Sequence, residues 1–128
     1  MKIEVSVGEL VDKVSILEIK LEHIRDPAKK ANVQKEYDLL KKYMEAAGID
    51  RESGAFQDLK RVNQVLWDIE DRIRVHERDA RFDDAFIQLA RSVYRENDKR
   101  AALKKSINLA HGSELIEEKE YVEYESPQ

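Results

Sequence analysis

Apolar side chains in this sequence recur every three or four residues over several long stretches. This spacing puts them on one face of an α-helix and does not fit the strict alternation of a half-buried strand. The first stretch has the seam typical of coiled-coil packing, formed by Leu10, Val14, Leu17, Leu21 and Ile24. The pattern therefore predicts an all-α fold, an antiparallel bundle of three to four long helices.

Capping residues divide the chain into its helices. Ser6 and Glu9 have the spacing of a capping box, and Asp26 with Pro27 is a second helix start. Asp83 can cap a further helix after a tight turn, although one continuous helix from residue 56 to 110 remains the alternative. We expect a single domain with an extended arm at 1–6, helices at 7–25, 27–47, 56–78 and 83–110, and an acidic docking tail at 111–128.

The two terminal segments carry a different pattern. Residues 2–6 alternate between polar and apolar side chains, and the acidic tail includes Tyr121, Val122 and Tyr124. Such segments can pair as strands, because each has an unpaired backbone edge. Pairing of residues 2–6 with residues 120–124, within one chain or between two chains, is therefore an open expectation.

Composition agrees with this helical fold and limits the classes of function. Charged residues make up 39% of the 128 residues and hydrophobic residues 41%, with only four Gly and two Pro. No apolar signal-like stretch opens the sequence and no apolar run is long enough to span a bilayer, which predicts a cytoplasmic protein without a membrane segment. The absence of cysteine is compatible with a reducing cytosol. The net charge of -4 argues against nucleic-acid binding.

The fourth predicted helix has a gap in its apolar face. Between Val93 and Leu103 the core positions are taken by polar side chains, among them Asn97 and Arg100. A buried arginine needs a partner, which acids of the third or the first helix could supply, or an external carboxylate or phosphate. The candidates for this buried polar network or anion-binding pocket are Lys13, Lys20, Asn97, Arg100, Lys104, Asp68 and Asp71.

Three apolar residues lie away from the main helical seams and indicate self-association. Ile16 and Ile19 form a second apolar face on the first predicted helix, and Trp67 lies more than a quarter turn from the seam of the third. Subunit contact is the favoured interpretation of Trp67, with tail packing and ligand stacking as alternatives. These residues predict a homodimer.

Residues that carry bond-making chemistry are sparse. The three histidines lie far apart in the sequence, and there is no cysteine, Gly-rich phosphate loop or nucleophile motif. We therefore expect neither a metal nor a cofactor. The leading hypothesis is an interaction or accessory protein with a protein partner, and the alternative is a small helical enzyme or sensor that holds an anionic ligand between helices.

Three stretches carry a resemblance to a known family: SVGELVDKVSILEIKLE, LWDIEDRIR and ARSVYRENDKRAALKKSIN. The sequence resembles a family of small uncharacterised bacterial proteins of about this length. The resemblance implies no activity, cofactor or site residue. It implies only a setting, a bacterial pathway related to surface glycans.

Overall fold

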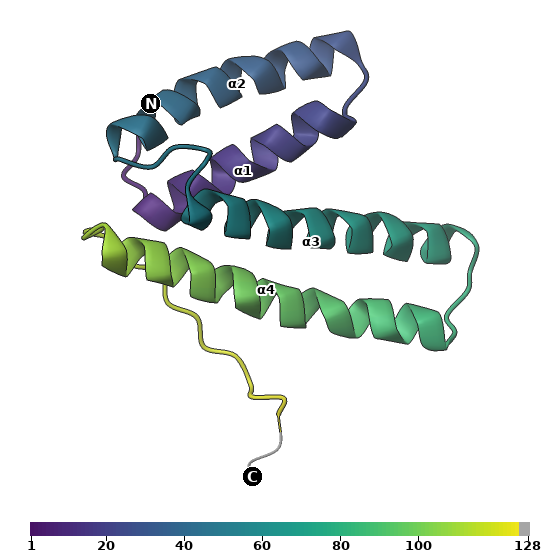
Figure 1. The fold of residues 1–128 in the computed structure, drawn as a ribbon. Coiled ribbons are helices and arrows are strands. Elements are labelled where there is room, and N and C mark those ends of the chain that lie inside the picture. Colours follow the sequence, from purple (N-terminus) through teal and green to yellow (C-terminus); the bar gives the residue numbers. More distant parts are fainter. Residues whose placement is uncertain (126–128) are drawn as a thin grey trace.

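The computed structural model describes residues 1–125 and confirms the all-α bundle. Its four helices are α1 (Val7–His23), α2 (Pro27–Ala46), α3 (Gly54–Arg78) and α4 (Asp84–Ala110), and no strand forms among the described residues (Figure 1). Helix α1 ends two residues earlier than expected, and α3 begins two residues earlier. Ser53 explains the second difference, because its side chain accepts a hydrogen bond from the Phe56 backbone and caps α3.

Side-chain caps begin the other three helices as well. Ser6 accepts from the Glu9 backbone at 3.1 Å, and Asp26 accepts from the first turn of α2. Asp83 caps α4, so α3 and α4 are separate helices. The turn between them contains Ala80 with a φ of 52°, a left-handed conformation that is uncommon outside glycine.

Helix α1 is at the centre of the arrangement. It packs against α2, α3 and α4, whereas within residues 1–125 the backbone of α2 comes close to no helix other than α1. Figure 1 shows two hairpins, α1 with α2 and α3 with α4, which meet at one end and diverge toward the other. The described termini also leave this shared end.

The hydrophobic core lies at that shared end. Every helix contributes to it, and so does the loop between α2 and α3. Its buried members are Val11, Val14, Met44, Ile49, Phe56, Leu59 and Ile107. Farther along the α3–α4 hairpin, Val65, Val75 and Ile87 are exposed, so the hairpin ends are held by fewer buried contacts.

Candidate functional site

Helix α1 buries a carboxylate, that of Asp12, which is 0% exposed. Arg100 of α4 donates to it twice, from Nε at 2.9 Å and from Nη2 at 2.5 Å. Asn63 of α3 donates a third hydrogen bond at 2.8 Å and also contacts the hydroxyl of Ser15. The hydrogen bonds from Arg100 to Asp12 raise the pKa of Arg100 above its ordinary value, although partial burial lowers it. One carboxylate therefore joins three helices through charged and polar contacts.

Lys104 forms a second buried ion pair one turn farther along α4. Its Nζ lies 2.7 Å from Glu9 of α1 and 2.9 Å from Glu117 of the chain that follows α4. Burial lowers the pKa of Lys104, but the hydrogen bonds to both carboxylates outweigh it and raise that pKa. The ammonium therefore stays charged and links three segments of the chain.

The start of α1 is held directly against the end of α4. The backbone N–H of Gly8 donates to Oδ1 of Asn108 at 2.6 Å, and that of Val7 donates to the Ser113 hydroxyl at 3.1 Å. A Cβ at Gly8 would collide with the backbone carbonyl of Lys104. Only glycine allows this close approach of the two helices.

A third cluster surrounds Glu18, which follows Asp12 on α1 by six residues. Arg51 and Lys60 donate to its Oε1 at 2.6 and 2.7 Å, and the Tyr37 hydroxyl donates to its Oε2 at 2.9 Å. Burial raises the pKa of Glu18, but these three donors outweigh it and hold the pKa at about 2. This cluster ties α1 to α2, to α3 and to the loop between them.

The structure places the predicted site residues in different environments. Arg100 and Lys104 are in the buried pairs, whereas Asn97 is half-buried and lines a groove beside α4. Lys13 is exposed 3.8 Å from Glu36, and Lys20 is half-buried in the last turn of α1. Lys104 and Asn97 line two different hollows beside α4.

The acids expected on α3 are not the partners of Arg100. Asp68 and Asp71 are exposed, and neither forms an ion pair within residues 1–125. Asp12 of α1, the other source that the sequence allowed, occupies that place. Asp12 is 0% exposed, and an unpaired carboxylate buried in this way would be costly.

The second apolar face of α1 consists of Ile16 and Ile19, and these two residues differ in burial. Ile19 is 1% exposed, so its side chain is covered within the single chain. Ile16 is half-buried. Trp67 is also half-buried and stacks on His23 of α1, with ring centroids 4.9 Å apart.

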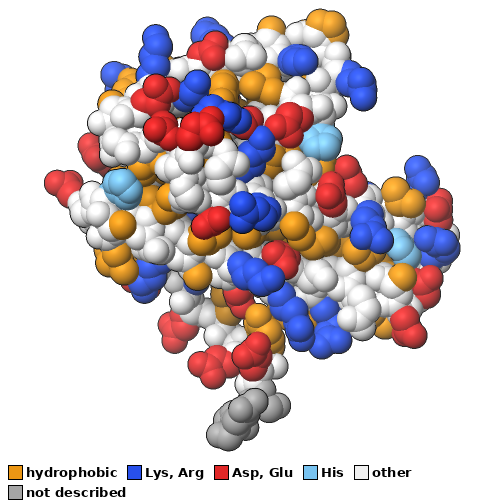
Figure 2. Space-filling model, viewed as in Figure 1, with side chains coloured by type: hydrophobic (Ala, Val, Ile, Leu, Met, Phe, Trp, Pro, Cys, Tyr) orange, Lys and Arg blue, Asp and Glu red, His pale blue; other side chains and the backbone are white. Residues whose placement is uncertain are grey.

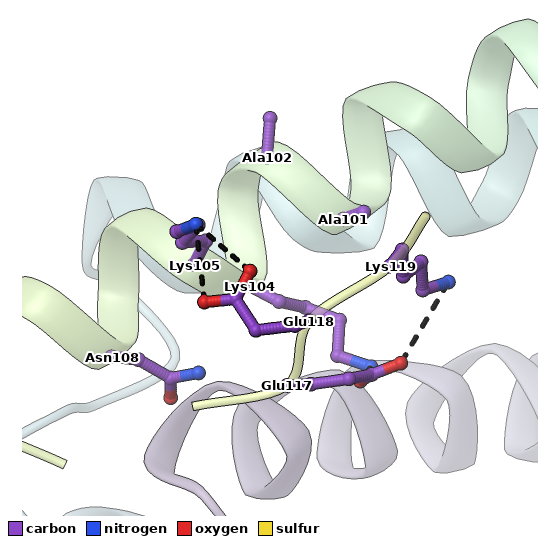
Figure 3. A pocket seen from close by; sticks show the side chains of 8 residues that line it. All are labelled: Ala101, Ala102, Lys104, Lys105, Asn108, Glu117, Glu118 and Lys119. Carbon is purple, nitrogen blue, oxygen red and sulfur yellow. Dashed lines mark hydrogen bonds and ion pairs between the residues drawn. The ribbon is translucent and has the colours of Figure 1, made fainter. Parts of the chain in front are cut away.

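Two neighbouring acids tie the chain after α4 to that helix. We call residues 114–125 the C-terminal segment. Glu117 reaches Lys104, and Glu118 reaches Lys105 at 3.2 Å, beside a small cavity of about 190 Å³ (Figure 3). The Tyr124 ring lies 4.8 Å from that of Tyr94.

A larger groove lies between this segment and α4, with a volume of about 1170 Å³. Its apolar and aromatic lining residues are Val93, Tyr94, Ala101, Tyr121, Val122 and Tyr124, and its polar lining residues are Asn97, Asp98, Lys119, Glu123 and Glu125. Figure 2 shows hydrophobic and acidic side chains together on the segment, at the bottom of the view.

Two of the three histidines, His23 and His76, make contacts that hold the fold. His23 stacks on Trp67, and Nδ1 of His76 is 2.9 Å from the Arg81 carbonyl oxygen in the turn before α4. Residues 1–125 contain no group of three or more side chains placed to hold a metal ion. None of the helices in this part of the chain is long and apolar enough to cross a membrane.

Packed helices joined by ion pairs along α1 define this chain as an all-α helical-bundle protein. It belongs to a family of unknown function, DUF6165, whose model matches residues 1–127. No match was found among curated proteins or among solved structures. Family membership confirms the resemblance to a group without an established activity and assigns a role to no residue.

Several residues of these clusters escaped the sequence reasoning. Glu18, Asn63 and Asn108 are buried and join different helices. One signal was present, because Glu18 lies between Leu17 and Ile19 in an apolar run of α1. An acid in such a position must find donors, but the sequence does not identify them.

Proposed function

We propose that this protein is a non-enzymatic interaction protein that works as a homodimer. One observation carries the proposal: large apolar side chains are exposed on the C-terminal segment, with Tyr121 73% and Val122 91% exposed. The segment is held against α4 by ion pairs and an aromatic contact, so these side chains have a defined position. An apolar surface of this kind is stabilised when a partner removes it from water.

The alternative, an enzyme or sensor that binds an anion between helices, has weaker support. Arg100 and Lys104 are the strongest candidates for gripping an anion, but each already contacts carboxylates of the chain. An external anion would have to displace Asp12 or Glu9 and leave a buried acid without a partner. The paired charges therefore favour a structural role for this cluster.

The proposed setting is the cytoplasm of a bacterium, in a pathway related to surface glycans. The absence of cysteine among the 128 residues is compatible with a reducing compartment. The glycan setting is supported by the family resemblance alone. Either partner class, a second copy or a further protein, would use the same exposed apolar surface.

Sedimentation velocity of the full chain over a concentration series tests the proposal. The wild type is expected to move from 15.0 kDa to twice that mass as its concentration rises into the high micromolar range. Val122→Asp is expected to shift this transition to higher concentration, because an aspartate at the exposed position opposes burial. A wild type that stays monomeric throughout would contradict the proposal.

Two further variants locate the interface. Leu39→Asp changes an exposed apolar residue on α2, away from the C-terminal segment, and is expected to leave the dimer unchanged. Trp67→Ala tests the surface favoured by the sequence. A loss of dimer in Trp67→Ala without a loss in Val122→Asp would move the interface from the C-terminal segment to α3.

A further inference from the structure

The C-terminal segment presents a groove that is ready to receive an extended chain. Tyr121, Val122 and Tyr124 line one wall, and Val93 and Ala101 of α4 line the other. Residues 116–125 make no backbone–backbone hydrogen bond within the described chain. Their peptide groups and apolar side chains are therefore both open to a partner.

The N-terminal arm, residues 1–6, has the complementary pattern. Met1, Ile3 and Val5 alternate with polar residues and are all exposed. The arm and the C-terminal segment both begin at the junction where the Val7 N–H contacts Ser113. From there they run in different directions, the arm toward α2 and the segment away from the bundle below α4 (Figure 1).

We infer that the groove receives the N-terminal arm of a second copy of this chain, which pairs as an antiparallel strand with residues 120–124. This inference rests on the proposed self-association and specifies its contacts. Strand addition would satisfy the open backbone groups of both segments and cover their apolar side chains. Each chain would give one arm and receive one, as a two-fold symmetric dimer requires.

Charge selects the direction of the pairing. An antiparallel register that places Ile3 opposite Val122 also places Lys2 opposite Glu123, with Glu4 diagonal to both Lys119 and Glu123. The parallel register with the same apolar pair would instead put Glu4 opposite Glu123. Like charges directly opposite each other are destabilising, so the antiparallel arrangement is favoured.

The apolar side chains agree with the same register. Met1, Ile3 and Val5 lie on one face of an extended arm, because alternate side chains of a strand share a face. Val122 and Tyr124 would lie beside Ile3 and Met1 on that face, and Glu120 beside Val5, whereas Tyr121 would lie on the opposite face. The groove wall formed by α4 would cover it.

Introduced cysteines test this pairing directly, because the natural chain has none. Ile3→Cys and Val122→Cys are made as separate full-length proteins, mixed in equal amounts and equilibrated in a glutathione redox buffer. The expected result is a disulfide-linked heterodimer that forms in several-fold excess over a control mixture of Ile3→Cys with Leu39→Cys. Equal yields in the two mixtures would overturn the inference.

A charge exchange supplies a second test that leaves the groove intact. Lys2→Glu and Glu123→Lys are each expected to weaken the dimer several-fold by sedimentation velocity. The double variant is expected to recover wild-type association, because the opposite charges face each other again. Losses that simply add would overturn the register.

The two proposals fail in different ways. A wild type that dimerises without the Ile3–Val122 disulfide preference overturns the arm exchange and leaves self-association standing. A wild type that remains monomeric at high micromolar concentration overturns both. Retention of the dimer in Trp67→Ala is the result expected from arm exchange.

Discussion

Asp12 and Arg100 are 88 positions apart in the sequence and form a two-pronged ion pair across the contact of α1 with α4. Removing the guanidinium would leave a fully buried carboxylate whose one remaining side-chain donor within residues 1–125 is Asn63. Arg100→Ala is therefore expected to lower the free energy of unfolding by about 3 kcal/mol, measured by urea denaturation.

Lys99→Ala is the matched control for this change. Lys99 precedes Arg100 and pairs with Glu96 of its own helix, but its side chain is exposed. Its loss is expected to change stability by less than about 0.5 kcal/mol. If Arg100→Ala instead keeps wild-type stability and abolishes a thermal shift caused by phosphate, the cluster is an anion pocket.

Gly8 sets the distance between α1 and α4. A methyl group there would press on the Lys104 carbonyl and stretch the hydrogen bond to Asn108. Gly8→Ala is expected to cost about 2 kcal/mol in thermal or urea unfolding. Gly54→Ala serves as the control, because a Cβ at Gly54 meets open space and that variant should keep wild-type stability or gain slightly.

The Glu18 cluster makes stability depend on pH in the acidic range. The pKa of the Glu18 carboxyl group falls from an ordinary value of 4.5 to about 2 in the folded chain. A lowered pKa means that the stabilisation is fully present above pH 4.5 and is lost as the pH falls toward 2. The wild type should lose up to about 3 kcal/mol of its free energy of unfolding over this window through Glu18 alone.

Urea denaturation at several pH values measures this loss. Glu18→Gln should be less stable than the wild type at neutral pH and should lose less stability on acidification. Glu36→Gln removes an exposed acid that is 3.8 Å from Lys13 and should follow the wild-type curve. Parallel pH curves for wild type and Glu18→Gln would contradict the proposed role of Glu18.

Ala80 adopts a left-handed conformation in the turn between α3 and α4. Replacing it with glycine removes the steric strain of its Cβ, so Ala80→Gly is expected to raise the free energy of unfolding by about 1 kcal/mol. Gly48 has a φ of 85° after α2, and Gly48→Ala should have the opposite effect for the same reason. Thermal unfolding by circular dichroism measures both, and a stabilising Gly48→Ala would contradict this argument.

The sequence predicted the helices well because their signals are local. Ser6, Asp26 and Asp83 are caps that act on backbone groups two or three residues away, and apolar spacing defines the helices between them. The start of α3 was misplaced because the cap at Ser53 was missed. The two helical hairpins diverge because of contacts between segments that are distant in the sequence. Such contacts produce no periodic pattern in the sequence, so the divergence could not be predicted from it.

The ion pairs were harder to predict for a physical reason. The gap in the apolar face of α4 showed that Arg100 needs a partner, but acids on α1 and α3 satisfied that need equally well in the sequence. The choice of Asp12 depends on the packing of α1 against α4. A helical wheel shows the direction in which Ile19 points from α1. It does not show which segment of the same chain covers that side chain, and for this reason the sequence suggested an interface there.

Hydrogen–deuterium exchange at low and high protein concentration tests the proposed assembly most directly. If two chains exchange their N-terminal arms, amides of residues 2–6 and 119–125 should become protected as concentration rises, because they join a strand pair. Amides around Trp67 should exchange at the same rate at low and high protein concentration. Arms that exchange equally fast at every concentration, while protection appears around Trp67, would contradict the arm-exchanged dimer.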